Sequence, residues 1–303
     1  MRHPGPDRRR GRAPRRRARI VALSPGRHLA RAAAALAWCW TSAAFAEPID
    51  LSGYELVFDE PFDALDVSPW REDGDSRWTA HTPWRGDFGD AVFTDPRPGF
   101  PFAVAAGILR IEAKRDETGL WRSGLLTTGD PNGGGFQAES GYFEARMKLP
   151  PGDGVWPAFW LGSLANERGL SGEIDVVEFY GHDPSAYQGA WHVWKTDPET
   201  GEVSHPASDL KRLGAAEGVP ADLAGSWHTW GVEVGPEEIV YHFDREPVWR
   251  VPTPAEFEGV RFFPLVNLAL GSGWPTDETP DPSHLYVDHV RVWRRLDAGA
   301  AER

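Results

Sequence analysis

The sequence is almost without cysteine. Its 303 residues contain a single one, Cys39, which lies in an N-terminal segment that we expect to be removed. A mature chain without thiols has no disulfide framework, no catalytic cysteine and no thiolate-bound metal. Long apolar runs are scarce as well. The run from Ala32 to Trp40 is too short for a membrane span, so we expect no membrane insertion.

Lysine is missing from the first 46 residues, although these contain eleven arginines. The apolar run leads into Ala44-Phe45-Ala46, a small-x-small pattern typical of a signal-peptidase site, which predicts cleavage before Glu47. We interpret residues 1–46 as a signal peptide and expect an exported protein, secreted or periplasmic. Its basic stretch is unusually long, and a start at Val21 would give a signal peptide of ordinary length. The alternative of a nucleic-acid-binding arm is disfavoured, because no aromatic residue is interleaved with the arginines.

Positive charge is scarce in the rest of the chain. Cleavage before Glu47 removes eleven basic residues and one acidic residue, which leaves 21 basic and 44 acidic residues and a net charge of −23. A surface of this sign repels nucleic acid and anionic membranes, and it suits a soluble exported protein with a neutral or cationic substrate. Residues 47–303 contain no Pro/Ser/Gly linker and no internal repeat. We therefore expect a single domain. We also expect a monomer.

Helical patterns are nearly absent from the chain. The one candidate for a short amphipathic helix lies within residues 207–224. Elsewhere apolar and polar residues alternate with the period of two that is typical of strands, most clearly in "GYFEARMKL" at 141–149. Turn signals such as Gly235-Pro236 and Asp244-Arg245 separate further short strands. The pattern predicts an all-β fold, a two-sheet antiparallel β-sandwich with one concave face open to a ligand.

Tryptophan, in contrast, is abundant, with 15 residues. Several of them lie among polar neighbours in the sequence: Trp78, Trp84, Trp156, Trp160, Trp191, Trp194 and Trp274. Any one of them could simply pack the core. Taken together, flat aromatic faces beside carboxylates and amides are what stacking on a sugar ring requires, because the C–H faces of a pyranose are apolar. We therefore expect a polysaccharide substrate.

Three carboxylates lie within six positions of the segment "SGEIDVVEFYG", residues 171–181. On a strand, Glu173 and Asp175 point to the same side, whereas Glu178 lies an odd number of residues from Glu173 and would point to the other. Either Glu178 is unrelated surface charge, or one extra residue, a β-bulge, restores the parity. With the bulge, the Cα atoms of the two glutamates lie roughly 13 Å apart and their carboxyl groups about 5 to 6 Å apart. That separation is typical of retaining glycoside hydrolases.

The context of this motif is specific. "GVWPAFWLG" at 154–162, followed by "GEIDVVEFYG" at 172–181, resembles the active-site segment of glycoside hydrolase family 16. The similarity extends over most of residues 54–294, and the six-residue form of the acidic motif is similar to that of the laminarinases. The resemblance implies a concanavalin-like jelly roll and an endo-acting, retaining hydrolase of β-glycosidic bonds. The first expectation for its substrate is a β-1,3- or mixed-linkage β-glucan.

By the same resemblance, Glu173 matches the nucleophile and Glu178 the general acid, which becomes the base in the second step. Asp175 lies between them and would share a proton or a hydrogen bond with the nucleophile. His192 matches a histidine beside this trio; the alternative is a satisfied core histidine. The other residues that we expect to bind substrate are Trp84, Trp156, Trp160, Trp194, Asn267 and Trp274.

No cofactor is expected for catalysis. Many members of the family hold a structural calcium ion on the convex side, and Pro61, Gly107 and Asp288 lie at matching places. Ligation by oxygen atoms alone, completed by water, suits calcium. The alternative is that Asp288 is an ordinary edge-strand acid.

The substrate is the least determined feature. Residues 82–96, "TPWRGDFGDAVFTDP", form an insertion that we expect to line one end of the groove, where loops set specificity. A bacterial exopolysaccharide as substrate, and transglycosylation instead of hydrolysis, remain alternatives. A non-catalytic glycan-binding jelly roll is the alternative from another class of protein, and the intact carboxylate trio favours the enzyme.

Overall fold

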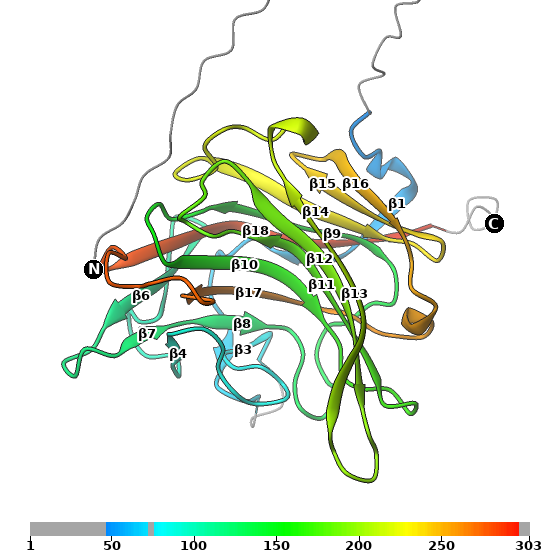
Figure 1. Ribbon diagram of the computed structural model, residues 1–303, viewed down its shortest axis with the longest axis horizontal. Helices are drawn as coiled ribbons and strands as arrows, with labels where there is room; N and C mark the ends of the chain where they lie inside the picture. The colour runs from blue at the N-terminus through cyan, green and yellow to red at the C-terminus, as the bar shows by residue number, and fades with distance from the viewer. Residues whose placement is uncertain (1–46, 72–75, 297–303) are drawn as a thin grey trace, which may run out of the picture. The chain divides into compact units, whose positions relative to one another are not determined.

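Two β-sheets pack face to face in the computed structural model, which describes residues 47–71 and 76–296 (Figure 1). Ten strands form one of them, which we call the back sheet: β1 Tyr54–Glu60, β4 Val92–Phe93, β5 Phe102–Ala105, β6 Ile108–Arg115, β7 Trp121–Ser123, β9 Gly141–Lys148, β14 Trp227–Val234, β15 Glu238–Phe243, β16 Glu246–Pro252 and β18 Ser283–Arg295. Their order is β16–β15–β14–β9–β18–β6–β7–β4, with β1 paired to β18 and β5 to β6.

Eight strands form the other sheet, the front sheet: β2 Val67–Ser68, β3 Trp78–Thr79, β8 Leu125–Thr127, β10 Val155–Gly162, β11 Leu170–Glu178, β12 Tyr187–Thr196, β13 Val203–Leu213 and β17 Phe263–Leu270. Their order is β13–β12–β11–β10–β17–β8–β3–β2. All strand pairs are antiparallel except β2 with β3 and β4 with β7. The predicted all-β, two-sheet sandwich is confirmed.

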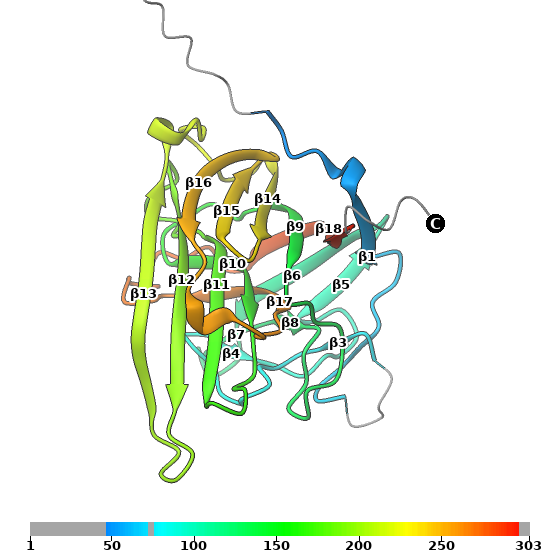
Figure 2. The same cartoon turned by 90° about the vertical axis from the view of Figure 1, so that its right-hand side faces the viewer.

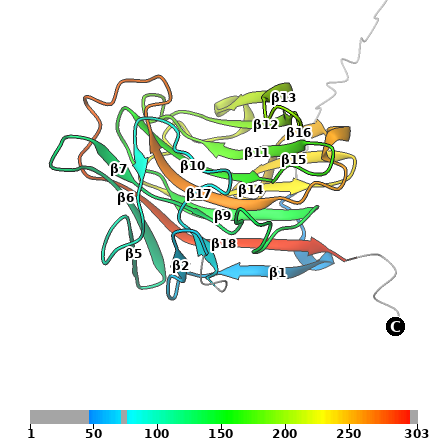
Figure 3. The same cartoon turned by 90° about the horizontal axis from the view of Figure 1, so that it is seen from below.

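The core lies between the sheets, because each long strand turns alternate apolar side chains inward. Phe143 and Trp230 of the back sheet and Phe159 and Val177 of the front sheet are completely buried in one cluster. The two layers are seen from below in Figure 3. Packing on the back sheet thus leaves the other face of the front sheet free for a ligand.

Helical structure is limited to three short 3₁₀ turns among the described residues: η1 Leu51–Gly53, η2 Ala215–Glu217 and η3 Ala255–Phe257. The prediction of a short amphipathic helix within residues 207–224 is wrong. Strand β13 continues to Leu213, and only η2 follows before Gly218, whose φ of +83° ends it. Backbone pairing with β12 holds this segment extended. None of the described helical turns is long and apolar enough to cross a membrane.

The β12–β13 hairpin forms one edge of the front sheet and projects beyond it (Figures 1 and 2). Strand β13 is exposed along most of its length. The expected signal peptide, residues 1–46, lies outside the described residues, and with it Val21 and Cys39. Export and cleavage before Glu47 therefore stay predictions.

Candidate active site

A bulge in β11 brings the three carboxylates to one face of the front sheet. Glu173 and Asp175 pair with His192 and Ala190 of β12, in regular alternation. Glu178 then pairs with Gln188, so that three steps along β11 correspond to two steps along β12. The extra residue restores the parity that the sequence spacing lacks. The predicted bulge is confirmed.

The other neighbour of β11 shows which residue is extra. On β10, Trp160 pairs with Asp175 and Phe159 with Val177, and Val176 is left without a partner. Val176 and Val177 are both buried in the core, although they are adjacent in the strand. Two consecutive inward side chains are what a bulge permits, since a regular strand would expose one of them.

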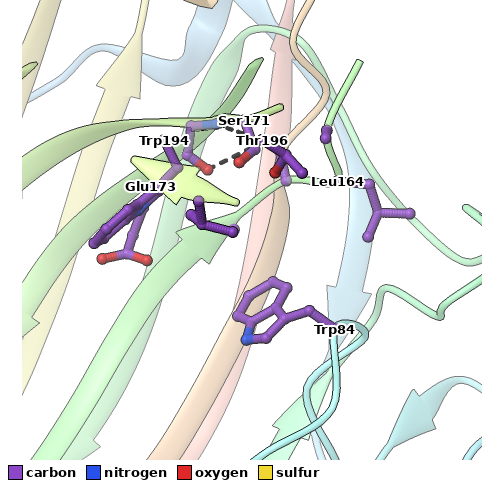
Figure 4. Close-up of a pocket in the computed structure, with 11 residues that line it drawn as sticks. Trp84, Leu164, Ser171, Glu173, Trp194 and Thr196 are labelled. Atoms are coloured by element: carbon purple, nitrogen blue, oxygen red, sulfur yellow. Dashed lines mark hydrogen bonds between the residues drawn. The ribbon is translucent and has the colours of Figure 1, made fainter. Parts of the chain in front are cut away.

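The carboxylates lie in a groove across the front sheet. A cavity of about 400 Å³ is lined by Trp84, Phe88, Trp156, Ala158, Trp160, Glu173, Asp175, Glu178, Trp194 and Asn267. A second cavity of about 550 Å³ shares Trp84, Glu173 and Trp194 with it and extends the groove past Glu173. In Figure 4, Trp84 stands across this second cavity from Glu173 and Trp194. Beyond Glu178, a third cavity of about 320 Å³ is lined in part by Tyr180 and Trp274.

Glu178 is held by two hydrogen-bond donors. The indole Nε1 of Trp156 and the hydroxyl of Tyr180 both donate to its Oε1, each at 3.1 Å. Burial raises the pKa of Glu178, and the two donors oppose this shift because they stabilise its charged form. Since both bonds fall on Oε1, the proton of the acid form is left to Oε2.

Asp175 is the most deeply buried of the three acids, with 6% of its surface exposed. Its Oδ2 lies 3.2 Å from Nε2 of His192, which is 4.0 Å from Oε1 of Glu173. Burial, and then the charge of Glu178, raise the pKa of Asp175 well above its usual range. His192 thus lies against the acids and is not an isolated core residue.

Glu173 shares this environment. Burial, followed by the charge of Asp175, raises its pKa to about 8, although His192 and the Trp194 indole favour its carboxylate form. Three carboxyl groups so close cannot all be charged at neutral pH, because each charge disfavours the next. The cleft can therefore hold one protonated acid beside one carboxylate, the pair that acid-assisted nucleophilic chemistry needs.

Aromatic side chains form the floor and one wall of the groove. Trp156 and Trp160, four residues apart on β10, both line the central cavity. Nε1 of Trp160 donates to Oδ1 of Asn267 at 2.7 Å. The Nδ2 group of Asn267 is buried and has no hydrogen-bond partner among the described residues. An amide donor in that position is suited to a hydroxyl group of a ligand.

The insertion at residues 82–96 lies over this floor. The Phe88 ring contacts Trp156 and Trp160 edge-on, at centroid distances of 5.5 and 5.9 Å. The loop is anchored to β17, where the amide of Asp90 donates to the carbonyl of Leu270 at 2.8 Å. The backbone approaches so closely that a side chain at Gly89, whose φ is +70°, would place its Cβ 2.3 Å from the same carbonyl oxygen.

Other predicted residues have different surroundings. Trp84, with 48% of its surface exposed, packs on Trp160 and Phe263 at the rim. Trp274 lies at the Glu178 end of the groove, where it packs on His182 at a centroid distance of 3.7 Å. Two tryptophans that the sequence placed among polar residues face away from the groove: Trp78 is buried in the core, and Trp191 packs on Phe257.

Three residues of the site were missed in the sequence: Tyr180, Phe88 and His205. Tyr180 had a signal, because it lies two residues after Glu178 and so points to the same side. Phe88 lies within the insertion at residues 82–96, but it was not identified individually. His205, whose Nε2 is 3.0 Å from Nδ1 of His192, had no signal in its own segment.

The three residues predicted to bind calcium lie in and beside the back sheet. A Cβ added to Gly107 would lie 3.8 Å from the carbonyl oxygen of Pro61 and 3.9 Å from Oδ1 of Asp63, so oxygen atoms do gather there. Oδ2 of Asp288 is already engaged, at 2.9 Å from Nδ1 of His289 and 3.4 Å from Nη1 of Arg146. The oxygen atoms of Pro61 and Asp63 beside Gly107 are of the kind that calcium binds, and the site stays a prediction.

Comparisons with known proteins relate this chain to sugar-cleaving enzymes. Residues 111–291 match the family model of glycosyl hydrolases family 16. An endo-1,3-1,4-beta-glycanase of Rhizobium meliloti (strain 1021) is 35% identical over 208 residues, which are 65% of this chain and 40% of that protein. A beta-glucanase of Rhodothermus marinus is 30% identical over 216 residues, which are 64% of this chain and 70% of that protein. The chain thus spans less than half of the length of the first of these relatives.

Solved structures agree with the fold. The catalytic domain of an endo-1,3-beta-glucanase (laminarinase) from Thermotoga petrophila RKU-1 superposes with a TM-score of 0.59 at 26% identity, over 80% of this chain and 99% of that one. A non-specific endo-beta-1,3(4)-glucanase has a TM-score of 0.64 at 24% identity, over 82% of this chain and 95% of that one. The second likeness shows the jelly-roll fold alone.

Proposed function

This chain belongs to glycosyl hydrolases family 16, and on that premise we propose that it is an exported, endo-acting β-glucanase that cleaves its substrate with retention of configuration. The observation that carries the proposal is the bulge in β11, which turns Glu173, Asp175 and Glu178 into one groove. A module that only bound glycan would gain nothing from three buried acids, whose raised pKa values reflect unfavourable burial and repulsion.

In the first step, the Glu173 carboxylate attacks the anomeric carbon and forms a glycosyl ester. Oε2 of Glu178 gives its proton to the departing glycosidic oxygen, so that the C–O bond breaks as the new ester bond forms. Esterification removes the negative charge of Glu173, one of the charges that keep Glu178 protonated. The pKa of Glu178 then falls, and its carboxylate takes a proton from the water that hydrolyses the ester.

The expected substrate is a neutral β-1,3- or mixed-linkage β-glucan. Trp84, Trp156, Trp160 and Trp194 offer apolar faces along the groove, and Nδ2 of Asn267 offers a buried donor. Of the two relatives named above, one is an endo-1,3-1,4-beta-glycanase and the other a beta-glucanase. Because the groove continues past both glutamates, cleavage inside a chain is favoured over removal of terminal sugars.

Release of reducing ends from laminarin, mixed-linkage glucan and a β-1,4-glucan tests the proposal, with Glu173→Gln as the matched control. We expect oligosaccharides from at least one of the first two, and a loss of several orders of magnitude in kcat with retained binding in the variant. Products longer than the substrate would indicate transglycosylation. Binding without release from any glucan, in either protein, would favour the non-catalytic alternative.

We further propose export through residues 1–46, a monomeric state, and a structural calcium ion at Pro61, Gly107 and Asp288. The export proposal is supported by the small-x-small pattern before Glu47. N-terminal sequencing of the native product tests both the cleavage site and the start at Val21. A mature chain that begins elsewhere than at Glu47 would contradict the cleavage site.

A further inference from the structure

The row of side chains that contains Glu178 continues across the front sheet to its edge strand. Glu178 of β11 pairs with Gln188 of β12, and Gln188 pairs with Arg212 of β13. Directly paired residues of antiparallel strands point to the same side, so Gln188 and Arg212 share the groove face with Glu178. Neighbouring strands lie about 4.8 Å apart, which puts the Cα atoms of Glu178 and Arg212 roughly 10 Å apart. The groove face therefore reaches past the acids to β13, at the edge of the sheet (Figure 2).

The cavity of about 320 Å³ beyond Glu178 is lined by both of these residues, Gln188 and Arg212. Trp274 and His182 line the same cavity. Trp274 has 46% of its surface exposed and packs on His182 at a centroid distance of 3.7 Å. An exposed aromatic face beside polar side chains suits a sugar ring, which has apolar C–H faces and a rim of hydroxyl groups. This cavity thus has the lining of a sugar subsite outside the central cavity.

Three hydrogen bonds hold the guanidinium of Arg212 in place. Nε and Nη2 both donate to Oδ2 of Asp183, at 2.9 and 2.6 Å, and Nη2 also donates to Oγ of Ser185 at 3.0 Å. The hydrogen bond from Ser185, together with Arg212, lowers the pKa of Asp183, which stays a carboxylate near neutral pH. Among the described residues, none accepts a hydrogen bond from Nη1. Because the Arg212 side chain is 55% exposed, the N–H groups of Nη1 can reach a ligand.

The place of this cavity relative to the two glutamates indicates which part of a glucan reaches it. By the proposed function, Glu173 attacks the anomeric carbon from the side opposite the departing oxygen, and Glu178 protonates that oxygen. The departing part of the chain therefore lies on the Glu178 side of the bond that breaks. The distance of roughly 10 Å between Glu178 and Arg212 leaves room for the first departing sugar, so that the second one meets Arg212.

We propose that Arg212 determines specificity on the leaving-group side, by donating from Nη1 to hydroxyl groups of the second sugar beyond the cleaved bond. This inference deepens the proposed function and rests on it. Asp183 and Ser185 already fix the Arg212 side chain, so less rotamer entropy is lost when a sugar binds. Gln188 adds an amide group to the same surface. The protein therefore prefers glucans that place at least two sugars on the departing side.

Two substrates that differ only on the departing side test this role. One is a β-glucan oligosaccharide with two glucose residues beyond the cleaved bond, and the other carries in their place a single aryl group, too short to reach β13. Arg212→Met keeps an unbranched side chain and removes its donors. It should lower the ratio of kcat/KM for the oligosaccharide to kcat/KM for the aryl glycoside about 10-fold, the lower end for a hydrogen bond from a charged group.

Arg250→Met, on β16 of the back sheet, is the matched control. The Arg250 side chain is 56% exposed and its Nη1 donates to Oε1 of Glu238 at 2.8 Å, so this change also removes an exposed guanidinium bonded to a carboxylate. The ratio should stay at the unaltered value in this variant. An unchanged ratio in Arg212→Met, whether kcat/KM falls equally on both substrates or on neither, would overturn the inference. An equal decrease of the ratio in Arg250→Met would overturn it as well.

Binding separates this inference from the proposed function. In a Glu173→Gln background, which cannot form the glycosyl ester, Arg212→Met should weaken binding of the same oligosaccharide about 10-fold in isothermal titration calorimetry. If no glucan were cleaved but this difference in binding were found, the proposed reaction would fail and the subsite would stand. If glucans were cleaved and bound equally well with and without Arg212, only the subsite would fail. An oligosaccharide that is neither cleaved by the unaltered protein nor bound by either variant would overturn both.

Discussion

Tyr180→Phe offers a direct test of the surroundings of Glu178. The change removes one hydroxyl group, which donates to Oε1 of Glu178 at 3.1 Å. The ring itself lies parallel to Trp156, at a centroid distance of 5.9 Å and an interplanar angle of 18°, and phenylalanine keeps that contact. The second donor on Oε1, Nε1 of Trp156, also stays. The change therefore removes only the hydroxyl, with its bond to Glu178 and its interaction with Ser272, and leaves the packing of the ring in place.

The magnitude follows from the charge of the acceptor. A hydrogen bond to an ionised group contributes about 1.5 to 3 kcal/mol, and we take the lower end because Oε1 keeps its other donor. Since one pKa unit corresponds to about 1.36 kcal/mol, the pKa of Glu178 should rise by about 1 unit. The sign is positive because Tyr180 stabilises the carboxylate form, and its loss favours the protonated acid. Glycosidic cleavage needs that acid form, so activity should extend to higher pH.

The assay is kcat/KM on a soluble β-glucan oligosaccharide between pH 4 and pH 10. The alkaline limb of Tyr180→Phe should lie about 1 pH unit above that of the unaltered protein. Tyr286→Phe, on β18 of the back sheet, serves as the control and should not move the limb. A limb at the unaltered position, or at lower pH, would refute the assignment of Glu178 as the acid that Tyr180 tunes.

Three further predictions concern the bulge, the two-step reaction and calcium. Deletion of Val177 should remove the extra residue of β11 and turn Glu178 out of the groove, which should reduce the activity of the folded protein at least about 100-fold. Full activity in the same reducing-end assay would contradict the bulge argument. The Glu178→Ala variant should still carry out the first step on an aryl glycoside with a good leaving group. Added azide should then restore turnover and give a β-glycosyl azide as product. An α-glycosyl azide would show that Glu173 is not the nucleophile. Chelation should lower the melting temperature in a thermal scan while the protein remains active at low temperature, since an ion bound only to the folded state stabilises it; an unchanged curve, with no metal in the purified protein, would count against the site.

The sequence could predict the sandwich because most of its strands bury one face. In β9, for instance, the alternating apolar residues Phe143, Ala145 and Met147 all belong to the core, although Tyr142 and Glu144 on the other face are buried as well. The odd spacing between Glu173 and Glu178 pointed to the bulge by the same alternation. In the structure, the adjacent residues Val176 and Val177 are both buried, as the bulge requires.

Local alternation fails where both faces of a strand are exposed. Strand β13 buries little besides Leu213, so its apolar residues are not ordered by the core. Ala207, Leu210 and Leu213 happen to recur every three residues, as in a helix, and this explains the wrong prediction for residues 207–224. Only backbone pairing with β12 holds the segment extended, and the bulge in that pairing lies at His205, which stacks on Trp194.

The sequence by itself determined the sheets, the groove-facing acids Glu173, Asp175 and Glu178, and the tryptophans beside them. The tertiary structure decided which groups surround those acids: Phe88 from a distant loop, Tyr180 on the same oxygen as Trp156, and His205 across two strands. The physical reason is that side-chain direction along one strand is a local consequence of backbone geometry. Hydrogen bonds and burial between strands depend on pairing register, and a single extra residue in an exposed neighbour changes that register without a trace in the hydrophobic pattern.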